Sequence, residues 1–261
     1  MILDRLAASA RKRVEEKKRR RPLTELQREA EAMEKNTGFP FRQAVEAEGI
    51  SFICEVKKAS PSKGIIAEQF PYLEIAEDYQ AAGAAAISVL TEPEYFLGQD
   101  RYLKEIARQA AVPVLRKDFT VDPYQIYEAK VLGASAVLLI CSILSLEQLK
   151  EYLKLARGLG LSALVETHDS REIDLALEAG AGIIGVNNRN LQDFQVDVSN
   201  SLRLRELIPP GVLYVSESGV RTRRDVEILE QNGTDGVLIG ETLMRSPDRQ
   251  RTLRELKGGA G

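Results

Sequence analysis

The unit that decides the fold runs over residues 134–166 and reads ASAVLLICSILSLEQLKEYLKLARGLGLSALVE. It contains an apolar run at 134–140, a segment of helical character at 146–158, and a second apolar run that begins at Ser162. Strands that are apolar on both faces and are separated by helices are typical of a parallel sheet. The unit therefore predicts a β–α–β arrangement.

The same alternation of strand and helix repeats along the chain from about residue 50. Eight short runs rich in Val, Ile, Leu and Ala are strand candidates: 51–56, 85–90, 112–116, 134–140, 162–165, 182–186, 212–216 and 236–239. Segments of helical character follow them at 73–82, 101–109, 123–132, 146–158, 171–179, 201–207, 223–231 and 241–256. Eight such units without an obvious linker predict an α/β protein with a closed (β/α)8 TIM barrel.

A doubly wound open sheet is the alternative fold for strands and helices that alternate in this way. Such a sheet usually carries a glycine-rich turn after its first strand. Here the corresponding residues 57–61 read KKASP and contain no glycine. We therefore favour the closed barrel.

The chain ahead of the first strand has a different pattern, that of two amphipathic helices. Apolar residues at helical spacing occur over residues 2–35, and Pro22 marks a break between the two segments. We expect residues 1–46 to form an N-terminal helical extension and residues 47–261 to form the barrel, within a single domain that spans 1–261.

The composition excludes several chemistries. The chain has one His and two Cys, and Cys54 and Cys141 are far apart, so a His-rich zinc site and a CxxC motif are both excluded. A Ser-His-Asp arrangement would have to use His168. Lys plus Arg number 36 and Asp plus Glu number 39, which leaves lysines and carboxylates as the acid–base groups.

The charge is unevenly distributed, with a basic segment on an acidic body. Residues 11–21 carry eight basic and two acidic side chains, so the rest of the chain carries −9 against −3 for the whole. This segment fits either an arm that binds nucleic acid or a solvated helix face. We favour the solvated face and expect no nucleic-acid partner, because no aromatic residues are interspersed.

Neither export nor membrane insertion is indicated. The N-terminus becomes polar after a few residues, unlike a signal peptide, and the best apolar run, 136–140, is too short to span a bilayer. Two distant cysteines suit a reducing compartment. We expect a cytoplasmic protein without a membrane partner.

Polar residues cluster where most of the predicted strands end, which is where a barrel carries its functional groups. Because successive side chains of a strand point to opposite faces, and one face must meet apolar helices, the strand ends can be sorted by parity. The side chains assigned to the barrel mouth are Glu55, Lys57, Lys117, Glu166, Asn187 and Glu217. Such a set can supply a general acid and a general base near neutral pH. A network of structural ion pairs is the alternative, less favoured because buried charges cost several kcal/mol per ion.

A second signal lies after the last two predicted strands. Ser218-Gly219 precedes a helical segment that begins near Thr222, and Gly240-Glu241 opens the last helix. Loops at these two positions form the usual phosphate site of a barrel, because backbone N–H groups and the start of a helix attract anions. Glycine also serves in simple turns between strand and helix, so the two pairs alone carry little weight.

His168 and the two cysteines are less convincing candidates. His168 follows Glu166, but residues 169–172 resemble a capping box, which indicates the start of a helix. Cys54 falls on the outward face of its strand and Cys141 near the end of another. All three are interpreted as structural residues, and the cysteines as packing residues.

Taken together, these motifs resemble the indole-3-glycerol-phosphate synthase family over nearly the whole chain. The matching stretches, in the family's order, are 2–4 (ILD), 55–64 (EVKKASPSKG), 90–92 (LTE), 95–96 (YF), 115–119 (LRKDF), 164–168 (LVETH), 185–191 (GVNNRNL), 216–220 (SESGV) and 240–244 (GETLM). The resemblance implies a (β/α)8 barrel with an N-terminal helical extension. It also implies a carboxy-lyase of tryptophan biosynthesis that uses no metal and no organic cofactor.

The resemblance further implies a substrate and a set of roles. The substrate would be 1-(2-carboxyphenylamino)-1-deoxyribulose 5-phosphate, which closes an indole ring and loses CO2 and water. Lys117 matches the general acid that protonates the substrate ketone. Lys57 matches a lysine on the substrate carboxylate, and which lysine acts as acid in which step stays open. Glu166 matches a base for dehydration, and Glu55 matches a carboxylate that orients the lysines.

The binding residues implied by the resemblance surround this set. Asn187 and Arg189 match groups for the substrate's hydroxyl and carboxylate, and Glu217 matches a hydroxyl-binding or supporting carboxylate. The phosphate loops correspond to Ser218, Gly219, Gly240 and Glu241. An apolar wall for the aromatic ring corresponds to Pro61, Phe96, Phe119, Leu138 and Leu191.

Another phosphosugar barrel, such as an aldose–ketose isomerase, is the rival enzyme. Those enzymes typically use Cys and Asp or a pair of Asp residues, whereas Lys and Glu occupy the predicted mouth here. We expect a small phosphorylated substrate as the partner, and a monomer or weak homodimer.

Overall fold

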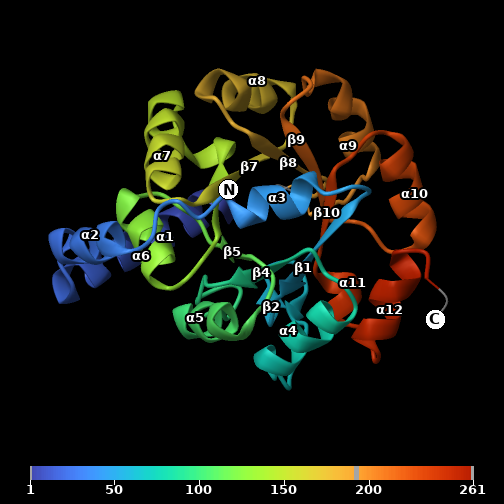
Figure 1. The fold of residues 1–261 in the computed structure, drawn as a ribbon, viewed down its shortest axis with the longest axis horizontal. Helices are drawn as coiled ribbons and strands as arrows, with labels where there is room; N and C mark the ends of the chain where they lie inside the picture. Colours follow the sequence, from blue (N-terminus) through green and yellow to red (C-terminus); the bar gives the residue numbers. More distant parts are fainter. Residues whose placement is uncertain (1, 191–193, 260–261) are drawn as a thin grey trace.

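The computed structural model describes residues 2–190 and 194–259, and its centre is a closed parallel barrel (Figure 1). The strands are β1 (Ser51–Val56), β4 (Ala86–Leu90), β5 (Val114–Lys117), β6 (Ala136–Ile140), β7 (Ser162–Thr167), β8 (Ile183–Asn187), β9 (Leu213–Glu217) and β10 (Gly236–Ile239). Each pairs with its neighbours in chain order, and β1 pairs with β10 to close the ring. The predicted (β/α)8 TIM barrel is confirmed.

Alternate strand residues fill the inside of the barrel, as their parity predicts. The buried inner cluster contains Ile53, Ala86, Leu115, Ala136, Leu138, Leu164, Ile183, Leu213, Val215 and Leu238. The opposite faces of the strands, including Cys54, pack with the surrounding helices in a separate cluster. Because charged mouth residues such as Lys117 share the inward parity, they extend the inner column of side chains toward the carboxyl ends of the strands.

The helices form the outer layer around the strands (Figure 1). They are α4 (Tyr72–Ala81), α5 (Asp100–Gln109), α6 (Pro123–Val131), α7 (Leu146–Gly158), α8 (Ser170–Ala179), α9 (Ser199–Leu204), α10 (Arg223–Gln231), α11 (Glu241–Met244) and α12 (Arg249–Leu256). Short 3-10 turns, η1 (Cys141–Ile143) and η2 (Arg205–Leu207), supplement them. The predicted single helix at 241–256 is wrong. Pro247 follows the end of α11, and Asp248 then caps α12 by accepting from the Arg251 N–H.

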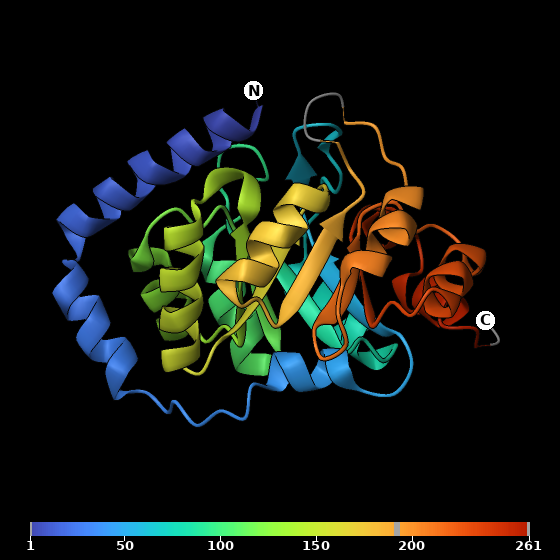
Figure 2. The ribbon, with the colours of Figure 1, turned by 90° about the horizontal axis from the view of Figure 1, so that it is seen from above.

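The opposite end of the barrel is closed by α3 (Pro40–Glu46), which lies across the end where the strands begin (Figure 2). Its Phe41 and Val45 are fully buried in the inner cluster. The sequence pattern did not single out this helix. The barrel is consequently plugged at one end and open only at the carboxyl ends of its strands.

The N-terminal extension forms α1 (Ile2–Arg20) and α2 (Leu23–Ala32), with the predicted break at Pro22. Helix α1 runs along the outside of the barrel, and its first turn reaches the end toward which the strands point (Figure 2). Its apolar stripe is buried: Leu3, Leu6, Ala7, Ala10 and Val14.

The basic segment 11–21 is only partly a solvated face. Arg13 pairs with Asp118, Lys17 pairs with Asp100 and Glu128, and Lys18 pairs with Asp122. These acids belong to α5, α6 and the neighbourhood of β5, so charge complementarity joins α1 to the barrel. The exposed basic residues of the segment are Arg11, Lys12, Arg19 and Arg20.

A small hairpin that the pattern analysis did not predict follows β1. Its strands are β2 (Ala59–Ser60) and β3 (Gly64–Ile65), and they pair antiparallel. The hairpin brings Pro61, Ser62 and Lys63 to the rim of the barrel mouth. No helix in the described part of the chain is long and apolar enough to cross a lipid bilayer.

Candidate active site

The barrel mouth contains a cavity of about 410 Å³. All six side chains assigned to the mouth by strand parity line it: Glu55, Lys57, Lys117, Glu166, Asn187 and Glu217. Strand register explains their proximity, because Glu166 lies level with Gly185 of β8, and Asn187 lies level with Glu217 of β9. The parity assignment is confirmed for this set.

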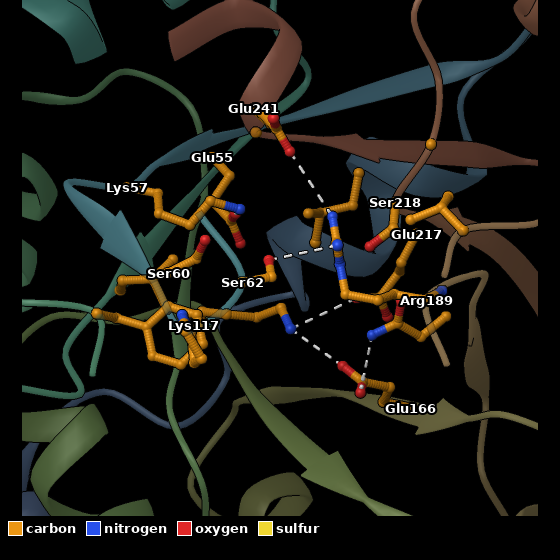
Figure 3. Close-up of a pocket in the computed structure, with 18 of the residues that line it drawn as sticks. Glu55, Lys57, Ser60, Ser62, Lys117, Glu166, Arg189, Glu217, Ser218 and Glu241 are labelled. Carbon is orange, nitrogen blue, oxygen red and sulfur yellow. Dashed lines mark hydrogen bonds and ion pairs between the residues drawn. The ribbon is translucent and has the colours of Figure 1, made fainter. Parts of the chain in front are cut away.

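The Lys117 ammonium lies at the centre of the charged side chains (Figure 3). Its Nζ donates to Glu166 Oε2 at 3.0 Å and lies 3.5 Å from Glu217 Oε2. Burial acts to lower the pKa of Lys117, but the negative charges of Glu166 and Glu217 outweigh burial, and the pKa is raised. With no substrate bound, Lys117 is therefore protonated at neutral pH and can act as an acid but not as a base.

The two carboxylates beside Lys117 have opposite pKa shifts. Burial acts to raise the pKa of Glu166, but Lys117 and His168 outweigh it, so Glu166 is ionised at neutral pH. Burial raises the pKa of Glu217 to about 8, with Lys117 opposing the shift and Glu166 adding to it. The two carboxyl groups share the Lys117 ammonium as their neighbouring cation. Ionisation of Glu166 is therefore favoured over ionisation of Glu217, because the negative charge of one raises the pKa of the other.

A second lysine–carboxylate pair lies on β1 and the residue that follows it. Lys57 Nζ donates to Glu55 Oε1, and the Glu55 side chain is only 5% exposed. Gly240 makes this arrangement possible, because a Cβ at that position would lie 2.4 Å from Glu55 Oε1 and 2.9 Å from Lys57 Nζ. The pair therefore packs directly against the backbone that precedes α11.

Asn187 and Arg189 connect β8 to the rest of the site. Asn187 donates through Nδ2 to Glu166 Oε1 at 3.2 Å and accepts from the Arg189 N–H at 3.0 Å. The Arg189 guanidinium points toward Glu241 and Ser62, with Nη2 at 3.7 Å from Glu241 Oε2 and Nη1 at 3.4 Å from Ser62 Oγ (Figure 3).

The loops predicted to bind phosphate line the same cavity through Ser218, Gly219, Gly240 and Glu241. Ser218 adopts a positive φ of 68°, which is uncommon for a residue other than glycine and marks a constrained turn after β9. Thr222 then caps α10, and Gly240 precedes the first turn of α11, whose N–H groups have no carbonyl partner one turn earlier.

The Glu241 side chain adds a feature that the sequence pattern did not reveal. Its carboxylate lies 3.6 Å from Lys63 Nζ, 3.2 Å from Arg245 Nε and 3.7 Å from Arg189 Nη2. Partial burial acts to raise the pKa of Glu241, but these cations outweigh it and lower the pKa. An anionic side chain thus occupies a cluster of three cations beside the predicted phosphate loops.

The apolar wall is largely where the resemblance placed it. Pro61, Phe96, Phe119 and Leu138 all line the cavity, and the rings of Phe96 and Phe119 lie 6.1 Å apart between centroids. Leu191 lies outside the described residues. Helix α1 contributes Ile2, Leu3 and Leu6 to the same wall. The apolar stripe of α1 was visible in the sequence, but its position over the mouth was not.

His168 lies closer to the mouth residues than its interpretation as a cap residue suggested. Asp169 does cap α8, by accepting from the Glu172 N–H at 2.9 Å. The His168 ring, however, lies between Glu172 and Glu166, at 3.0 Å from Glu172 Oε2 and 3.4 Å from Glu166 Oε1.

The two cysteines are buried in packing positions. Burial raises the pKa of Cys54 well above its usual value and raises that of Cys141 to about 12, so both thiols are protonated at neutral pH. Among the described residues, no group of three or more His, Cys, Asp and Glu side chains is placed to hold a metal ion.

Comparisons with known proteins find matches over nearly the whole chain. A family model described as indole-3-glycerol phosphate synthase matches residues 3–256. The chain is 56% identical to the protein of that name from Ruminiclostridium cellulolyticum, over 100% of both chains. It is 54% identical to the one from Endomicrobium trichonymphae, over 98% of this chain and 100% of that one.

Solved structures resemble the chain in fold alone. The 3-hexulose-6-phosphate synthase from Salmonella typhimurium superposes with a TM-score of 0.66 at 14% identity, over 80% of this chain and 97% of that one. The structure described as KGPDC from Streptococcus mutans superposes with a TM-score of 0.64 at 12% identity, over 81% and 97%.

Proposed function

Since the chain belongs to the indole-3-glycerol phosphate synthase family and has this family's carboxy-lyase activity in tryptophan biosynthesis, we propose that the cavity at the barrel mouth is its catalytic site. The observation that carries the proposal is the Lys117 ammonium between Glu166 and Glu217. Predicted phosphate loops and an aromatic wall line the same cavity. The substrate is 1-(2-carboxyphenylamino)-1-deoxyribulose 5-phosphate.

Ring closure needs an acid at the substrate ketone. Lys117 Nζ donates a proton to the ketone oxygen as the ring carbon that bears the carboxylate attacks the ketone carbon. The C–C bond to the carboxylate then breaks, CO2 leaves, and its electron pair restores the aromatic ring. A protonated lysine in a largely buried cavity suits this role, because the electric field of a cation is screened little there.

Dehydration needs an acid at the departing hydroxyl and a base at the neighbouring carbon. Glu166 is the base, because it is held ionised beside Lys117. Lys57 binds the substrate carboxylate and serves as the second acid, and Glu55 orients its ammonium through their ion pair. Glu217 lies 3.5 Å from the Lys117 ammonium and supports it together with Glu166. Asn187 and Arg189 hold the substrate's hydroxyl and carboxylate groups.

The two ends of the substrate are recognised by different chemistry. Backbone N–H groups around Gly219, Gly240 and Glu241 bind the phosphate, with Ser218 beside them. Pro61, Phe96, Phe119 and Leu138 enclose the aromatic ring. The reaction as derived uses only side chains of this chain, and we propose that no metal or organic cofactor takes part.

The chain's wider context completes the proposal. We propose that the extension 1–46 and the barrel 47–261 form one domain, supported by the ion pairs that join α1 to the barrel. The same pairing occupies three of the eight basic residues of the segment 11–21, which supports a protein without a nucleic-acid partner. We further propose a monomer or weak homodimer in the cytoplasm, with no membrane partner.

The assay is product formation from the synthetic substrate, followed by indole fluorescence. The chain contains no Trp, so protein background is low. An aldose–ketose isomerase substrate with a phosphate group serves as the control. Indole product from the first substrate and no turnover of the second are expected. No indole product under any condition in which the protein is folded would overturn the proposal.

A further inference from the structure

His168 occupies a place between two carboxylates, one of which lies in the catalytic cavity. Its Nδ1 lies 3.0 Å from Glu172 Oε2 on α8, and its Nε2 lies 3.4 Å from Glu166 Oε1 on β7. The ring is largely buried, with 17% of the side chain exposed. Nε2 has no hydrogen-bond partner among the described residues, so its approach to Glu166 is that of an ion pair when the ring is protonated.

The surroundings of His168 fix the ring in this place. The His168 N–H donates to Glu172 Oε2 at 2.8 Å, and the His168 carbonyl accepts from Asn200 Nδ2 at 3.1 Å. Ser142 Oγ of η1 lies 3.4 Å from Nδ1. Backbone and ring are thus held to α8, α9 and η1 together, more extensively than a helix cap requires.

The two oxygens of Glu166 have separate partners. Oε2 accepts from Lys117, whereas Oε1 accepts from Asn187 and faces His168. We propose that His168 is a positioning residue, whose imidazolium bridges Glu172 and Glu166 and holds the Glu166 carboxylate ionised and directed at Lys117. This inference rests on the proposed function, because His168 would act through Glu166, which is the base in that proposal.

The charges around the ring support an imidazolium. The acidic groups that act on it are Glu172 from α8, Glu166 from β7 and, as the smallest effect, Glu217 from β9, while Ser142 and Asn200 are neutral. Burial acts to lower the pKa of His168, but the hydrogen bond to Glu172 and the charge of Glu166 outweigh it, and the pKa is raised. In return, His168 is one of the groups that lower the pKa of Glu166.

The ring also has its own access to solvent. His168, Ser142, Glu172 and Asn200 line a second cavity of about 570 Å³, whereas Glu166 lines the catalytic one. The two cavities share Asn187 and Arg189, but His168 lines the second one and not the catalytic one, so its ring can exchange a proton through the second cavity. Loss of the His168 side chain should accordingly change proton affinities in the catalytic cavity more than substrate binding.

The direct test uses NMR, because His168 is the only histidine in the chain. The imidazole of His168 can be titrated in the free enzyme through its C–H resonances, with no other histidine to distinguish it from. Its midpoint is expected above the ordinary value of about 6.5, and Glu172→Gln and Glu166→Gln should each lower it. A midpoint at or below the ordinary value that does not change in Glu166→Gln overturns the inference. This measurement needs no turnover, so it stands or fails independently of the proposed function.

The second test is the pH dependence of turnover. In His168→Asn the neighbouring positive charge is gone, so the pKa of Glu166 rises and the acidic limb of kcat moves to higher pH. We expect kcat below the wild-type midpoint to fall by about tenfold, which is one pH unit of that limb, with KM within about twofold. The difference should shrink as the pH rises past the His168 midpoint.

The matched control is Asp169→Ala, which removes the α8 cap next to His168 but leaves the bridge in place. It should lower thermal stability without moving the pH profile. A purely structural role predicts that His168→Asn and Asp169→Ala behave alike. Coincident pH profiles for His168→Asn and wild type would also overturn the inference.

Discussion

Gly185 on β8 faces the carboxylate of Glu217 so closely that a Cβ at position 185 would lie 2.2 Å from Glu217 Oε1. The same Cβ would approach Leu164 Cδ1 to 3.2 Å. No heavy atoms come that close without displacement, so the buried Glu217 side chain occupies space that only a glycine leaves free. The position of a charged group beside Lys117 is therefore set partly by a residue that has no side chain.

Gly185→Ala is expected to displace Glu217 and lower both stability and turnover. Overpacking of a filled core costs about 1–3 kcal/mol, and displacement of Glu217 removes one of the two carboxylates that hold Lys117. Thermal unfolding and kcat measure the two effects. Gly158→Ala is the control, because Gly158 lies in α7 with nothing within 4 Å of its would-be Cβ. Equal behaviour of the two variants would contradict the steric argument.

Lys117→Ala is expected to lose on the order of 10²–10⁴ in kcat, because it removes the acid for ring closure. The protein should still fold, since Lys117 lies at the mouth and not in the apolar interior. Lys150→Ala provides a comparison, because Lys150 is 49% exposed and pairs with Glu178 on the surface. Single-turnover fluorescence separates ring closure from product release. A Lys117→Ala enzyme with near-wild-type kcat would remove Lys117 from its assigned role.

Glu217 should make stability fall as pH rises through the neutral range. Its pKa is about 8 in the folded protein against 4.5 ordinarily, so the folded state binds this proton more tightly than the unfolded state does. The stabilising contribution is complete below pH 4.5 and is lost as the pH rises toward 8. At about 1.4 kcal/mol per pKa unit, it amounts to a few kcal/mol at most.

Glu217→Gln isolates this contribution, because glutamine does not ionise. The free energy of unfolding of the variant, measured by urea unfolding at each pH, should increase relative to that of wild type as the pH rises from 5 to 8.5. A constant difference between the two proteins across this range would rule out a raised pKa for Glu217.

Glu241→Gln is expected to lower KM for the phosphorylated substrate by several-fold. The Glu241 carboxylate lies among Lys63, Arg189 and Arg245, close to the proposed phosphate loops, and it repels an incoming dianion. The gain should shrink at high salt, because Glu241 is about one-third exposed and its charge is partly screened. Glu227→Gln, on the exposed side of α10, is the control. An increase in KM would mean that Glu241 instead organises the cations for the substrate.

Much of this architecture follows from patterns that are local along the chain. Strands apolar on both faces indicated the barrel, and period-2 alternation placed Glu55, Lys117, Glu166 and Glu217 on one face of their strands. The break at Pro22 and the cap at Asp169 were likewise predicted from neighbouring residues. Such features depend on backbone geometry over a few residues, which the order of residue types largely determines.

Other features depend on contacts between segments that are far apart in sequence. Helix α3 plugs the barrel through Phe41 and Val45, and its seven residues are too few for a clear periodic signal. The predicted helix at 241–256 is interrupted at Pro247, and Asp248 caps the start of a second helix, α12. The basic segment 11–21 was interpreted as a solvated helix face, yet three of its eight basic residues pair with acids more than 80 residues away.

The sequence by itself determined which side chains point into the mouth, because strand parity is a property of the backbone. Only the tertiary structure decided which of these side chains form ion pairs with one another. Closure of the barrel and the stagger of its strands bring Lys117 between Glu166 and Glu217, place His168 against Glu166, and set Gly185 opposite Glu217. Proton affinities depend on distances and burial in three dimensions. The pKa differences that the proposed chemistry uses therefore arise only when the barrel is closed.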